Sequence, residues 1–306
     1  MTIAGGVTVS DVVREIAVEL SRAGIDTGRL DARLLVEAAT GCSQERLVLE
    51  PAMPLSETQA ARLCEMVRRR LEREPVARIL GERYFYGRRF LVTPATLDPR
   101  PDTEALIALA LRIADEEGWR YRAIEILDIG TGTGCILLTL LSELGKARGV
   151  GTDVSPAALE VAHQNAGLLG VNERVRWQLA RSLDVVTGPI DLVVSNPPYI
   201  ASSDIAGLDP DVRQYDPLLA LDGGADGLDI YREIVSGSAR PIFSSGTWFV
   251  VEIGAGQSAA VVDLIELHCG SDVARGHLTG VDLGGHTRCV AWNHKFSRRS
   301  KAYWQE

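Results

Sequence analysis

Apolar positions near the start of the chain recur with the spacing of an α-helix. In segment 9–20 they follow the pattern i, i+3, i+4, i+7, which places them on one helix face. These positions are Val9, Val12, Val13, Ile16 and Leu20. Thr8 and Asp11 form a variant of the capping box at the start, and Gly24 is a suitable stop. The pattern therefore predicts an amphipathic helix.

Two further helices are predicted in the first part of the chain. One covers 28–40 and stops at Gly41, and the other follows Ser56, whose capping box is completed by Gln59, and ends before Pro75. The apolar face of the helix over 28–40 is expected to consist of Leu30, Leu34, Leu35 and Ala38. Three amphipathic helices of this length predict a small helical bundle, which we place at residues 1–82.

Residues 83–98 change in character. Aromatic and aliphatic side chains surround Gly87, which favours a turn between two short strands. We interpret this β-hairpin as a linker that leads into a second domain at 99–295, and the polar segment 296–306 as a C-terminal tail.

From residue 101 onward, apolar strand patterns alternate with helical patterns. This alternation is typical of a doubly wound α/β fold with a mostly parallel sheet covered on both faces. The predicted strands cover 124–129, 148–152, 175–179, 191–195 and 247–253. The predicted helices cover 102–117, 134–144, 156–169, 228–239 and 257–268. The glycine pair within 281–292 predicts an antiparallel hairpin at the sheet edge, which completes seven strands.

Composition narrows the classes of protein. The chain has 306 residues and a net charge of −9, so non-specific binding to nucleic acid is not expected. Its five cysteines form no C-x-x-C pair and its five histidines no H-E-x-x-H, which argues against a metal site. The longest apolar run, 135–141, is too short to span a bilayer. We expect a cytoplasmic monomer without a signal peptide.

A glycine-rich loop follows the first strand of the predicted sheet. Asp128 precedes Gly130-Thr131-Gly132-Thr133-Gly134, and a helix begins directly afterwards. Glycines let a ligand approach the backbone, and a helix N-terminus offers free N–H groups. The third glycine comes one residue earlier than in G-x-G-x-x-G, so a pyrophosphate ligand is disfavoured. An acid before the loop suits a ligand that carries an ammonium or sulfonium charge. A tight turn without a ligand is the alternative.

Asp153 ends the next predicted strand, 23 residues after Gly130. A carboxylate roughly 20 residues beyond such a loop accepts hydrogen bonds from ribose hydroxyls in nucleotide sites. It could instead cap the following helix, although Ser155 could do so equally well. Asp153 fits any ribose and does not select the cofactor.

Asn196-Pro197-Pro198-Tyr199 follows the apolar strand at 191–195 and is the most specific motif in the chain. The prolines end the strand and fix the backbone, so that the Asn196 side chain and the Pro197 carbonyl are held rigidly. Two such acceptors can bind both hydrogens of a planar –NH2 group, on which Tyr199 can stack. A rigid turn with a capping asparagine is the alternative.

The glycine loop, the ribose acid and Asn-Pro-Pro-Tyr occur in an order that resembles class I S-adenosylmethionine-dependent methyltransferases acting on planar amino groups. The resemblance is closest to the HemK/PrmC family, and it extends over about 31–290. The segments that carry it are 74–82, 84–87, 99–104, 220–228, 252–254 and 282–288. It implies a class I methyltransferase fold with S-adenosylmethionine as cofactor. Residue patterns by themselves extend only to methyl transfer to an amino or amide nitrogen.

The resemblance also implies a substrate: the glutamine side-chain amide in the Gly-Gly-Gln motif of class I peptide release factors. The N-terminal domain would dock the protein substrate. Asn196, Pro197 and Tyr199 are the expected catalytic residues, and Pro198 joins them in substrate binding. The expected cofactor-binding residues are Asp128, Gly130, Thr131, Gly132, Thr133, Gly134, Asp153, Ser182 and Asn196. Ser182 is included although segment 180–183 departs from the acidic-aromatic pattern usual near the adenine in this family.

Alternative functions remain open at this stage. A glutamine methyltransferase of a ribosomal protein would share the same chemistry, and so would a DNA adenine-N6 methyltransferase, which is disfavoured by the acidic charge. A non-catalytic protein that binds S-adenosylmethionine is a third alternative. An NAD-dependent oxidoreductase is the fourth and least favoured.

Two segments suggest how a substrate could be held. Segment 201–226 is long for a loop, which favours a lid over the substrate. Segment 60–90 holds nine arginines and four glutamates, and this excess could dock an acidic protein or could form pairs within a solvated helix.

Overall fold

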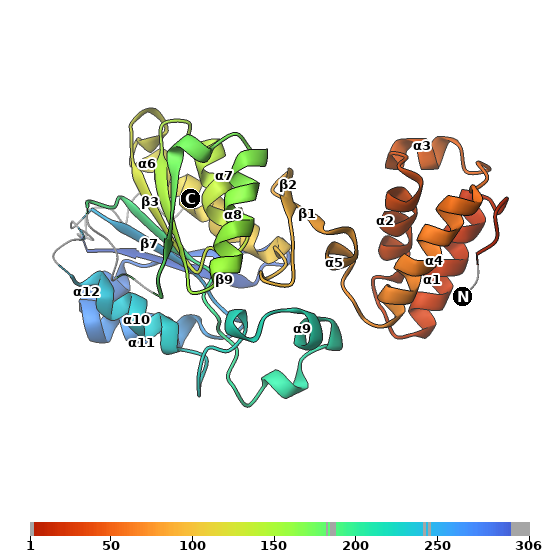
Figure 1. Ribbon diagram of the computed structural model, residues 1–306. Coiled ribbons are helices and arrows are strands. Elements are labelled where there is room, and N and C mark those ends of the chain that lie inside the picture. The colour runs from red at the N-terminus through yellow and green to blue at the C-terminus, as the bar shows by residue number, and fades with distance from the viewer. Residues whose placement is uncertain (1–2, 182, 184–187, 241–242, 244–245, 295–306) are drawn as a thin grey trace. The chain divides into compact units, whose positions relative to one another are not determined.

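The computed structural model describes residues 3–181, 183, 188–240, 243 and 246–294. The chain divides into two compact units. Unit 1 comprises Met1–Glu82 and Asp209–Tyr215, and unit 2 comprises Arg83–Leu208 and Asp216–Glu306. Figure 1 shows the elements of each unit along the chain. No helix within the described ranges is long and apolar enough to cross a membrane.

Unit 1 is a helical bundle. Its helices are α1 (Val9–Arg22), α2 (Gly28–Thr40), α3 (Gln44–Leu49), α4 (Glu57–Leu71), α5 (Val76–Leu80) and α9 (Pro210–Tyr215). The predicted caps are confirmed, because the Thr8 hydroxyl accepts from the Asp11 backbone N–H and Ser56 forms a complete capping box with Gln59. Gly41 ends α2 in the left-handed region. The short helices α3, α5 and α9 lack a helical apolar period and are not predicted.

The expected apolar face of α2 is wrong at one edge. Leu30 is 56% exposed, whereas Asp31 is buried and its carboxylate accepts from Arg70 Nε at 2.7 Å. The helix is therefore turned so that this ion pair faces inward, and its buried face comprises Gly28, Asp31, Ala32, Leu35, Val36 and Ala39. A pattern of apolar residues alone cannot show a buried charged position.

Unit 2 contains a doubly wound sheet of seven strands in the order β5-β4-β3-β6-β7-β9-β8. The strands are β3 (Glu125–Ile129), β4 (Arg148–Asp153), β5 (Val175–Leu179), β6 (Leu192–Ser195), β7 (Trp248–Glu252), β8 (Leu278–Val281) and β9 (Thr287–Asn293). The first five are parallel, and β9 pairs antiparallel with both β7 and β8. The predicted fold, including the C-terminal hairpin, is confirmed.

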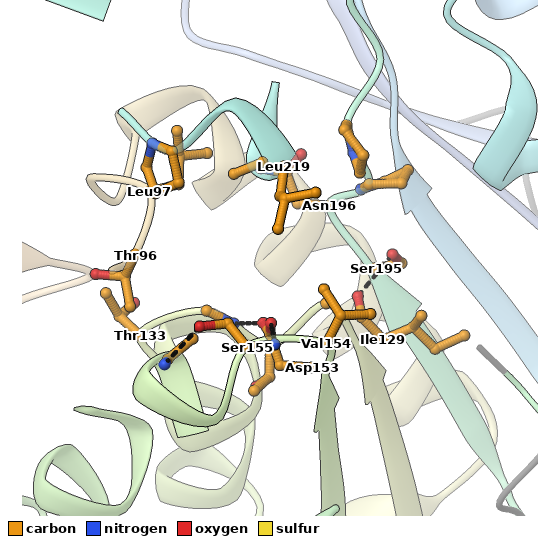
Figure 2. A pocket seen from close by; sticks show the side chains of 18 of the residues that line it. Thr96, Leu97, Ile129, Thr133, Asp153, Val154, Ser155, Ser195, Asn196 and Leu219 are labelled. Atoms are coloured by element: carbon orange, nitrogen blue, oxygen red, sulfur yellow. Dashed lines mark hydrogen bonds between the residues drawn. The ribbon is translucent and has the colours of Figure 1, made fainter. Parts of the chain in front are cut away.

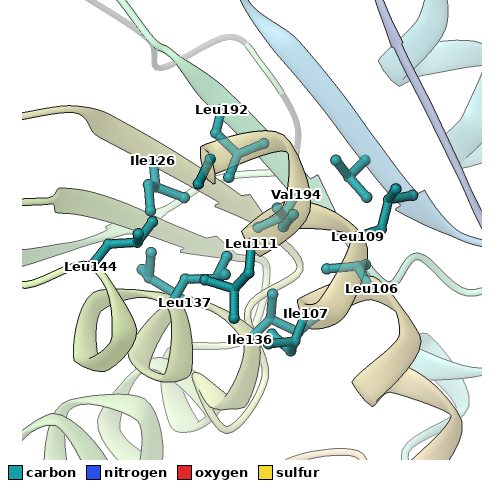
Figure 3. Close-up of a cluster of buried hydrophobic side chains, with 14 of the residues drawn as sticks. Leu106, Ile107, Leu109, Leu111, Ile126, Ile136, Leu137, Leu144, Leu192 and Val194 are labelled. Carbon is teal, nitrogen blue, oxygen red and sulfur yellow. The ribbon is translucent and has the colours of Figure 1, made fainter. Parts of the chain in front are cut away.

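Helices cover both faces of this sheet. They are α6 (Glu104–Glu116), α7 (Cys135–Glu143), α8 (Pro156–Leu168), α10 (Asp229–Ser238), α11 (Ser258–Cys269) and α12 (Ser271–Arg275). Alternate strand residues point to opposite faces. Ile126 and Val194 join one buried cluster with α6 and α7, which Figure 3 shows. Leu127 and Val193 join a second cluster with α10 and α11.

The predicted β-hairpin consists of β1 (Glu82–Phe85) and β2 (Arg88–Leu91). Phe85 and Phe90 are buried in the same cluster as α6 and α7, so the hairpin packs as part of unit 2. Asn165 of α8 holds it in place: its side-chain oxygen accepts from Leu91 N at 2.7 Å, and its nitrogen donates to the Leu91 and Thr133 carbonyls.

Candidate active site

A cavity of about 340 Å³ opens where the parallel strands of unit 2 end. Ligands of doubly wound sheets bind at this edge. Its walls include segments 95–100, 129–133, 153–155 and 195–198. Figure 2 shows Asp153 and Ser155 on one side of the cavity, with Asn196 and Leu219 on the other. The structure thus brings the three predicted motifs together.

The glycine loop forms one wall between β3 and α7. Gly130 and Gly132 have φ of 69° and 55°, and a Cβ built on either would meet no atom within 4 Å. Both residues line the cavity together with Thr131 and Thr133. Gly134 is not among the lining residues; a Cβ there would lie 2.9 Å from Leu138, so this glycine permits close packing at the start of α7.

Asp128 lies behind the loop and is not among the residues that line the cavity. Its side chain is fully buried, and Oδ2 accepts from the Thr131 hydroxyl at 2.6 Å. Burial raises the pKa of this carboxyl to about 7, although the Thr131 hydrogen bond opposes the change. Oδ1 is buried without a hydrogen-bond partner within the described ranges. Asp128 therefore supports the loop from below.

Asp153, at the end of β4, presents a fixed carboxylate to the cavity. Oδ2 accepts from Gly132 N and Oδ1 from Ser155 N, both at 2.9 Å. The Ser155 hydroxyl caps α8 by accepting from Ala158 N at 3.2 Å. Because Ser155 caps α8, Asp153 is not needed as the cap. The orientation of the Asp153 carboxylate is set by its hydrogen bonds from Gly132 N and Ser155 N.

Asn196 follows β6 and lies in the cavity wall with Pro197 and Pro198. Its side-chain nitrogen donates to the Thr103 hydroxyl oxygen at 3.2 Å. Oδ1 is the acceptor atom of this side chain, and it is not the atom that contacts Thr103. Tyr199 is half-buried against the second core cluster and is not among the lining residues. Burial raises the pKa of its hydroxyl.

Glycines and one glutamine brace the backbone of this motif. Gln257 donates to the Tyr199 carbonyl at 2.9 Å and accepts from Gly254 N at 2.9 Å. A Cβ on Gly227 would collide with the Tyr199 carbonyl oxygen, and one on Gly223 with that of Pro198. These contacts give a physical reason for the glycines in segments 220–228 and 252–254.

Two residues next to Asn196 were not selected from the sequence. Thr103 is buried immediately before α6, and Glu252 ends β7 with only 3% of its surface exposed. Burial raises the pKa of Glu252 to about 7, while Thr103, Arg288 and Asn196 lower it. Two sequence signals point to Glu252: it is an acid at the end of an otherwise apolar strand, and it lies in segment 252–254, which carries part of the family resemblance.

The residues before α6 have separate partners. Arg100 lines the cavity and pairs with the buried carboxylate of Asp216 at 2.7 Å. Asp102 pairs with Arg288 at 2.8 Å. The Glu104 carboxylate accepts from Tyr86 N at 2.9 Å and thereby anchors the hairpin. Only Arg100 of these can influence a ligand directly.

Other nucleophilic or basic candidates do not form a catalytic group. His163 and His286 are exposed and are not among the lining residues. Cys135 lines the cavity, but burial raises the pKa of its thiol to about 12. The described part of the chain holds no cluster of histidine, cysteine or acidic residues suited to a metal ion.

The region expected near an adenine is partly described. Ala180 and Arg181 line the cavity, whereas Leu183 is buried in the second core cluster. Ser182, which the sequence placed among the cofactor-binding residues, lies outside the described residues.

Segment 201–226 has two roles rather than one. Pro217, Leu219, Ala220 and Asp222 line the cavity, and Ile200 pairs with this stretch through Leu221 and Gly223. Residues 209–215 belong instead to unit 1, where Asp211 pairs with Arg70 and Arg73. The arginines of α4 are largely paired within unit 1, since Arg68 also binds Glu65 and Glu72.

Comparison of the fold defines the class of protein. A methyltransferase-domain family model matches residues 126–208. The catalytic domain of human METTL16 in complex with an RNA hairpin aligns with a TM-score of 0.54 at 15% identity, over 77% of this chain and 81% of that one. The N-terminal domain of human METTL16 aligns with a TM-score of 0.51 at 14% identity, over 85% and 93%. Such low identities show the fold alone: unit 2 has the fold of a class I methyltransferase.

Sequence relatives define the family more narrowly. The release factor glutamine methyltransferase of Cereibacter sphaeroides is 45% identical over 84% of this chain and 89% of its own length. That of Agrobacterium fabrum is 42% identical over 86% and 91%. A family model described as the PrmC N-terminal domain matches residues 11–81. The chain belongs to the release factor glutamine methyltransferase family.

Proposed function

We propose that this enzyme transfers a methyl group from S-adenosylmethionine to the side-chain amide nitrogen of the glutamine in the Gly-Gly-Gln motif of class I release factors. The observation that carries the proposal is the orientation of Asn196. Its nitrogen is turned to Thr103, so the amide nitrogen has a partner within the protein, and both Asn196 and Pro197 line the cavity. Two acceptors fixed in this way match the two hydrogens of a primary amide.

The residues of the cavity fit the cofactor. Gly130 and Gly132 leave open space where side chains would lie, and the Asp153 carboxylate is held ready to accept from ribose hydroxyls. Asp128 lies behind the loop with its pKa raised to about 7, and its ionised form would suit a cationic ligand. When bound, S-adenosylmethionine supplies an electrophilic methyl group on a sulfonium sulfur.

The chain's own residues would act by positioning the substrate amide. Its nitrogen is a poor nucleophile because the lone pair is delocalised into the carbonyl. Asn196 Oδ1 and the Pro197 carbonyl would accept the two N–H bonds, which raises electron density on nitrogen and aims its lone pair. Tyr199, braced by Gln257 and Gly227, would keep the motif rigid. The nitrogen can lose its proton after transfer, so no base stronger than water is required.

Incorporation of labelled methyl groups tests the substrate. The acceptors are a purified class I release factor, the same factor with its Gly-Gly-Gln glutamine changed to alanine, a ribosomal protein fraction and duplex DNA. Label on the first acceptor alone supports the proposal. Label on DNA or on a ribosomal protein in its place would reassign the substrate, and label on none would leave a non-catalytic cofactor-binding protein.

A variant tests the role of Asn196. Asn196→Ala should lower kcat by about 100-fold or more, because an amide held by one acceptor is poorly aimed. The dissociation constant of S-adenosylmethionine, measured by calorimetry, should change less than about threefold. Retained turnover by Asn196→Ala would remove this residue from the mechanism.

We further propose that residues 1–82 dock the protein substrate through a groove on unit 1. The groove lies between α1, α2 and α3, and its apolar side chains include Val13, Val18 and Val48. Three exposed arginines, Arg22, Arg29 and Arg33, also line it, and within the described ranges none has an acidic partner. Their charge fits an acidic, amphipathic surface of the substrate. The paired arginines of α4 are less suited to this role.

Charge reversal tests the groove. The double variant Arg29→Glu/Arg33→Glu should raise KM for the intact protein substrate by about tenfold, because it repels an acidic partner. It should leave kcat, and KM for a short Gly-Gly-Gln peptide, unchanged. Arg62→Glu is the matched control, since Arg62 is exposed on α4 and does not line the groove. Equal effects of both charge reversals would show general repulsion rather than docking.

The setting of the enzyme follows from its proposed substrate. Release factors act at the ribosome, so we place the enzyme in the cytoplasm, without a direct nucleic-acid or membrane partner. We propose that it is a monomer. Light scattering after size exclusion measures that mass.

A further inference from the structure

We propose that Glu252 is a positioning residue that fixes the orientation of the Asn196 side-chain amide through Thr103. The inference rests on the proposed function, because it concerns the atom of Asn196 that receives the substrate. Glu252 itself is not among the residues that line the cavity, so it is not expected to touch the substrate.

The sheet places Glu252 beside Asn196. Ser195 of β6 is paired with Val251 of the parallel strand β7, so the next residues along the two strands, Asn196 and Glu252, are neighbours. The Glu252 side chain is buried, and its main-chain carbonyl accepts from the Tyr231 hydroxyl at 2.7 Å. Both the side chain and the backbone of Glu252 are therefore fixed in place.

A short series of hydrogen bonds can connect the carboxylate to the amide. Asn196 Nδ2 donates to Thr103 Oγ1, which leaves the Thr103 hydroxyl proton available for another acceptor. Hydrogen bonding by the side chains of Thr103 and Asn196 lowers the pKa of Glu252. Glu252 Oε2 has no fully formed hydrogen bond within the described ranges, so the carboxylate retains capacity to accept one.

An ionised carboxylate only accepts hydrogen bonds. The ionised Glu252 carboxylate therefore favours the orientation in which the Asn196 amide nitrogen faces Thr103 and Glu252. It disfavours the orientation in which the Asn196 carbonyl oxygen faces them. A protonated carboxyl or a glutamine can also donate, and it would tolerate the flipped amide. The flipped amide would present N–H groups to the N–H groups of the substrate and could not bind it. Ionised Glu252 thus excludes the unproductive orientation.

Several other groups act on Glu252 within the described ranges, among them the Asp102 carboxylate, which raises the pKa of Glu252 but is itself paired with Arg288. Arg288 on β9 lowers the pKa of Glu252, but Arg288 is itself held between Asp102 and Asp282. Tyr199 and Tyr231 have pKa values raised by burial, so both hydroxyls are neutral near pH 7. The thiols that also interact with Glu252, Cys135 and Cys289, have pKa values raised to about 12. Glu252 is thus the group expected to titrate here.

Kinetics of the full-length enzyme test the proposal with a release factor as substrate. Glu252→Gln should lower kcat by about tenfold, and Glu252→Leu by about 100-fold, because the latter also removes the acceptor for Thr103. The dissociation constant of S-adenosylmethionine should stay within about twofold. In the wild type kcat should rise with pH through about 7, and Glu252→Gln should remove that step.

Thr103 provides an independent test that does not alter the buried charge. Thr103→Val should lower kcat by about tenfold, whereas Thr103→Ser keeps the hydroxyl and should retain activity. Tyr231→Phe is the structural control, since it removes a buried hydrogen bond to the Glu252 backbone without touching the carboxylate. Its kcat should remain within about twofold of the wild type.

The outcomes are distinguishable. If Asn196→Ala abolishes turnover but the Glu252 and Thr103→Val variants keep wild-type kcat, only this inference fails. If Asn196→Ala retains turnover, the proposed role of Asn196 fails first. A loss of cofactor affinity in the Glu252 variants equal to the loss in kcat, or a Tyr231→Phe variant as impaired as Glu252→Gln, would show a merely structural role.

Discussion

At the scale of single residues, two buried carboxyls lie near the carboxyl ends of parallel strands β3 and β7. Asp128 and Glu252 both have pKa values raised to about 7, and burial is the largest cause for each. Their ordinary values in an unfolded chain are near 4. Between these limits the folded state therefore holds protons that the unfolded state has already lost.

This difference predicts a pH dependence of stability. Where the folded state binds more protons, the free energy of unfolding falls as pH rises, here between about pH 4 and 7. Each unit of pKa difference corresponds to about 1.4 kcal/mol. Asp128→Asn should therefore gain stability relative to the wild type as pH rises through this window. Urea unfolding at pH 4.5, 6 and 7.5 measures the change.

The comparison between variant and wild type isolates the group, because other carboxyls contribute equally to both. Asp282 is one of these, and its pKa is lowered to about 2 mainly by the hydrogen bond from Arg288. Asp282→Asn should therefore not reproduce the effect of Asp128→Asn in this window. A stability difference between wild type and Asp128→Asn that does not change with pH would show that Asp128 is ionised throughout.

The residues that sequence reasoning found and missed differ in one physical respect. Asn196, Pro197 and Asp153 belong to local patterns in which a strand ends at a turn. Thr103 and Glu252 are brought next to Asn196 from distant parts of the chain by the sheet and α6. Such a juxtaposition has no local spacing, so a single sequence does not show it.

At the scale of elements, one asparagine joins three segments. Asn165 is fully buried on α8 and satisfies both backbone groups of Leu91 and the carbonyl of Thr133. The hairpin and the end of the glycine loop are thereby attached to the same helix. These bonds replace strand pairing that the short hairpin does not make with the large sheet.

Loss of this side chain should destabilise unit 2. Asn165→Ala leaves up to three buried or partly buried backbone groups without this partner, and we expect a loss of roughly 2–4 kcal/mol in the free energy of unfolding. Urea denaturation followed by tryptophan fluorescence measures it. Gln164→Ala is the adjacent exposed control on α8 and should change stability by less than about 0.5 kcal/mol. Equal stability of the two variants would show that water replaces the lost bonds.

Elements with a strong apolar period were predictable, including the five parallel strands and the helices between them. The short helices α3, α5 and α9 were not, because five or six residues are too few to show a period. The inward face of α2 was misplaced at Leu30 because a buried ion pair, Asp31 with Arg70, occupies the bundle interior. Tertiary contacts decide these features.

At the scale of the whole molecule, the chain passes between its two units three times, after residues 82, 208 and 215. The inserted residues 209–215 are fixed to the bundle by charge: Asp211 pairs with Arg70 at 2.9 Å and with Arg73 at 2.6 Å. The Tyr215 hydroxyl also donates to the Glu72 carbonyl at 2.9 Å. Unit 1 is therefore incomplete without a piece that follows Asn196-Pro197-Pro198-Tyr199 in the chain.

Removal of this attachment should expose the inserted segment. Asp211→Ala removes one of the two carboxylates that pair with the largely buried Arg70 and leaves Asp31 as the other. We expect faster amide exchange in 209–215 and a lower melting temperature of unit 1. Hydrogen–deuterium exchange measured by mass spectrometry resolves the segment. Gln214→Ala, exposed in the same helix, is the control and should exchange as the wild type does. Unchanged exchange in Asp211→Ala would show that Tyr215 suffices.

The threefold crossing limits how the protein can be recombined. A chimera in which residues 1–82 are exchanged for those of a relative would place a foreign α4 against the resident α9, and the charges at positions 70, 73 and 211 would have to match by chance. The exchangeable module is therefore discontinuous: it consists of the N-terminal bundle together with seven residues taken from inside the catalytic domain. Any engineered change of substrate through the bundle would have to carry both pieces.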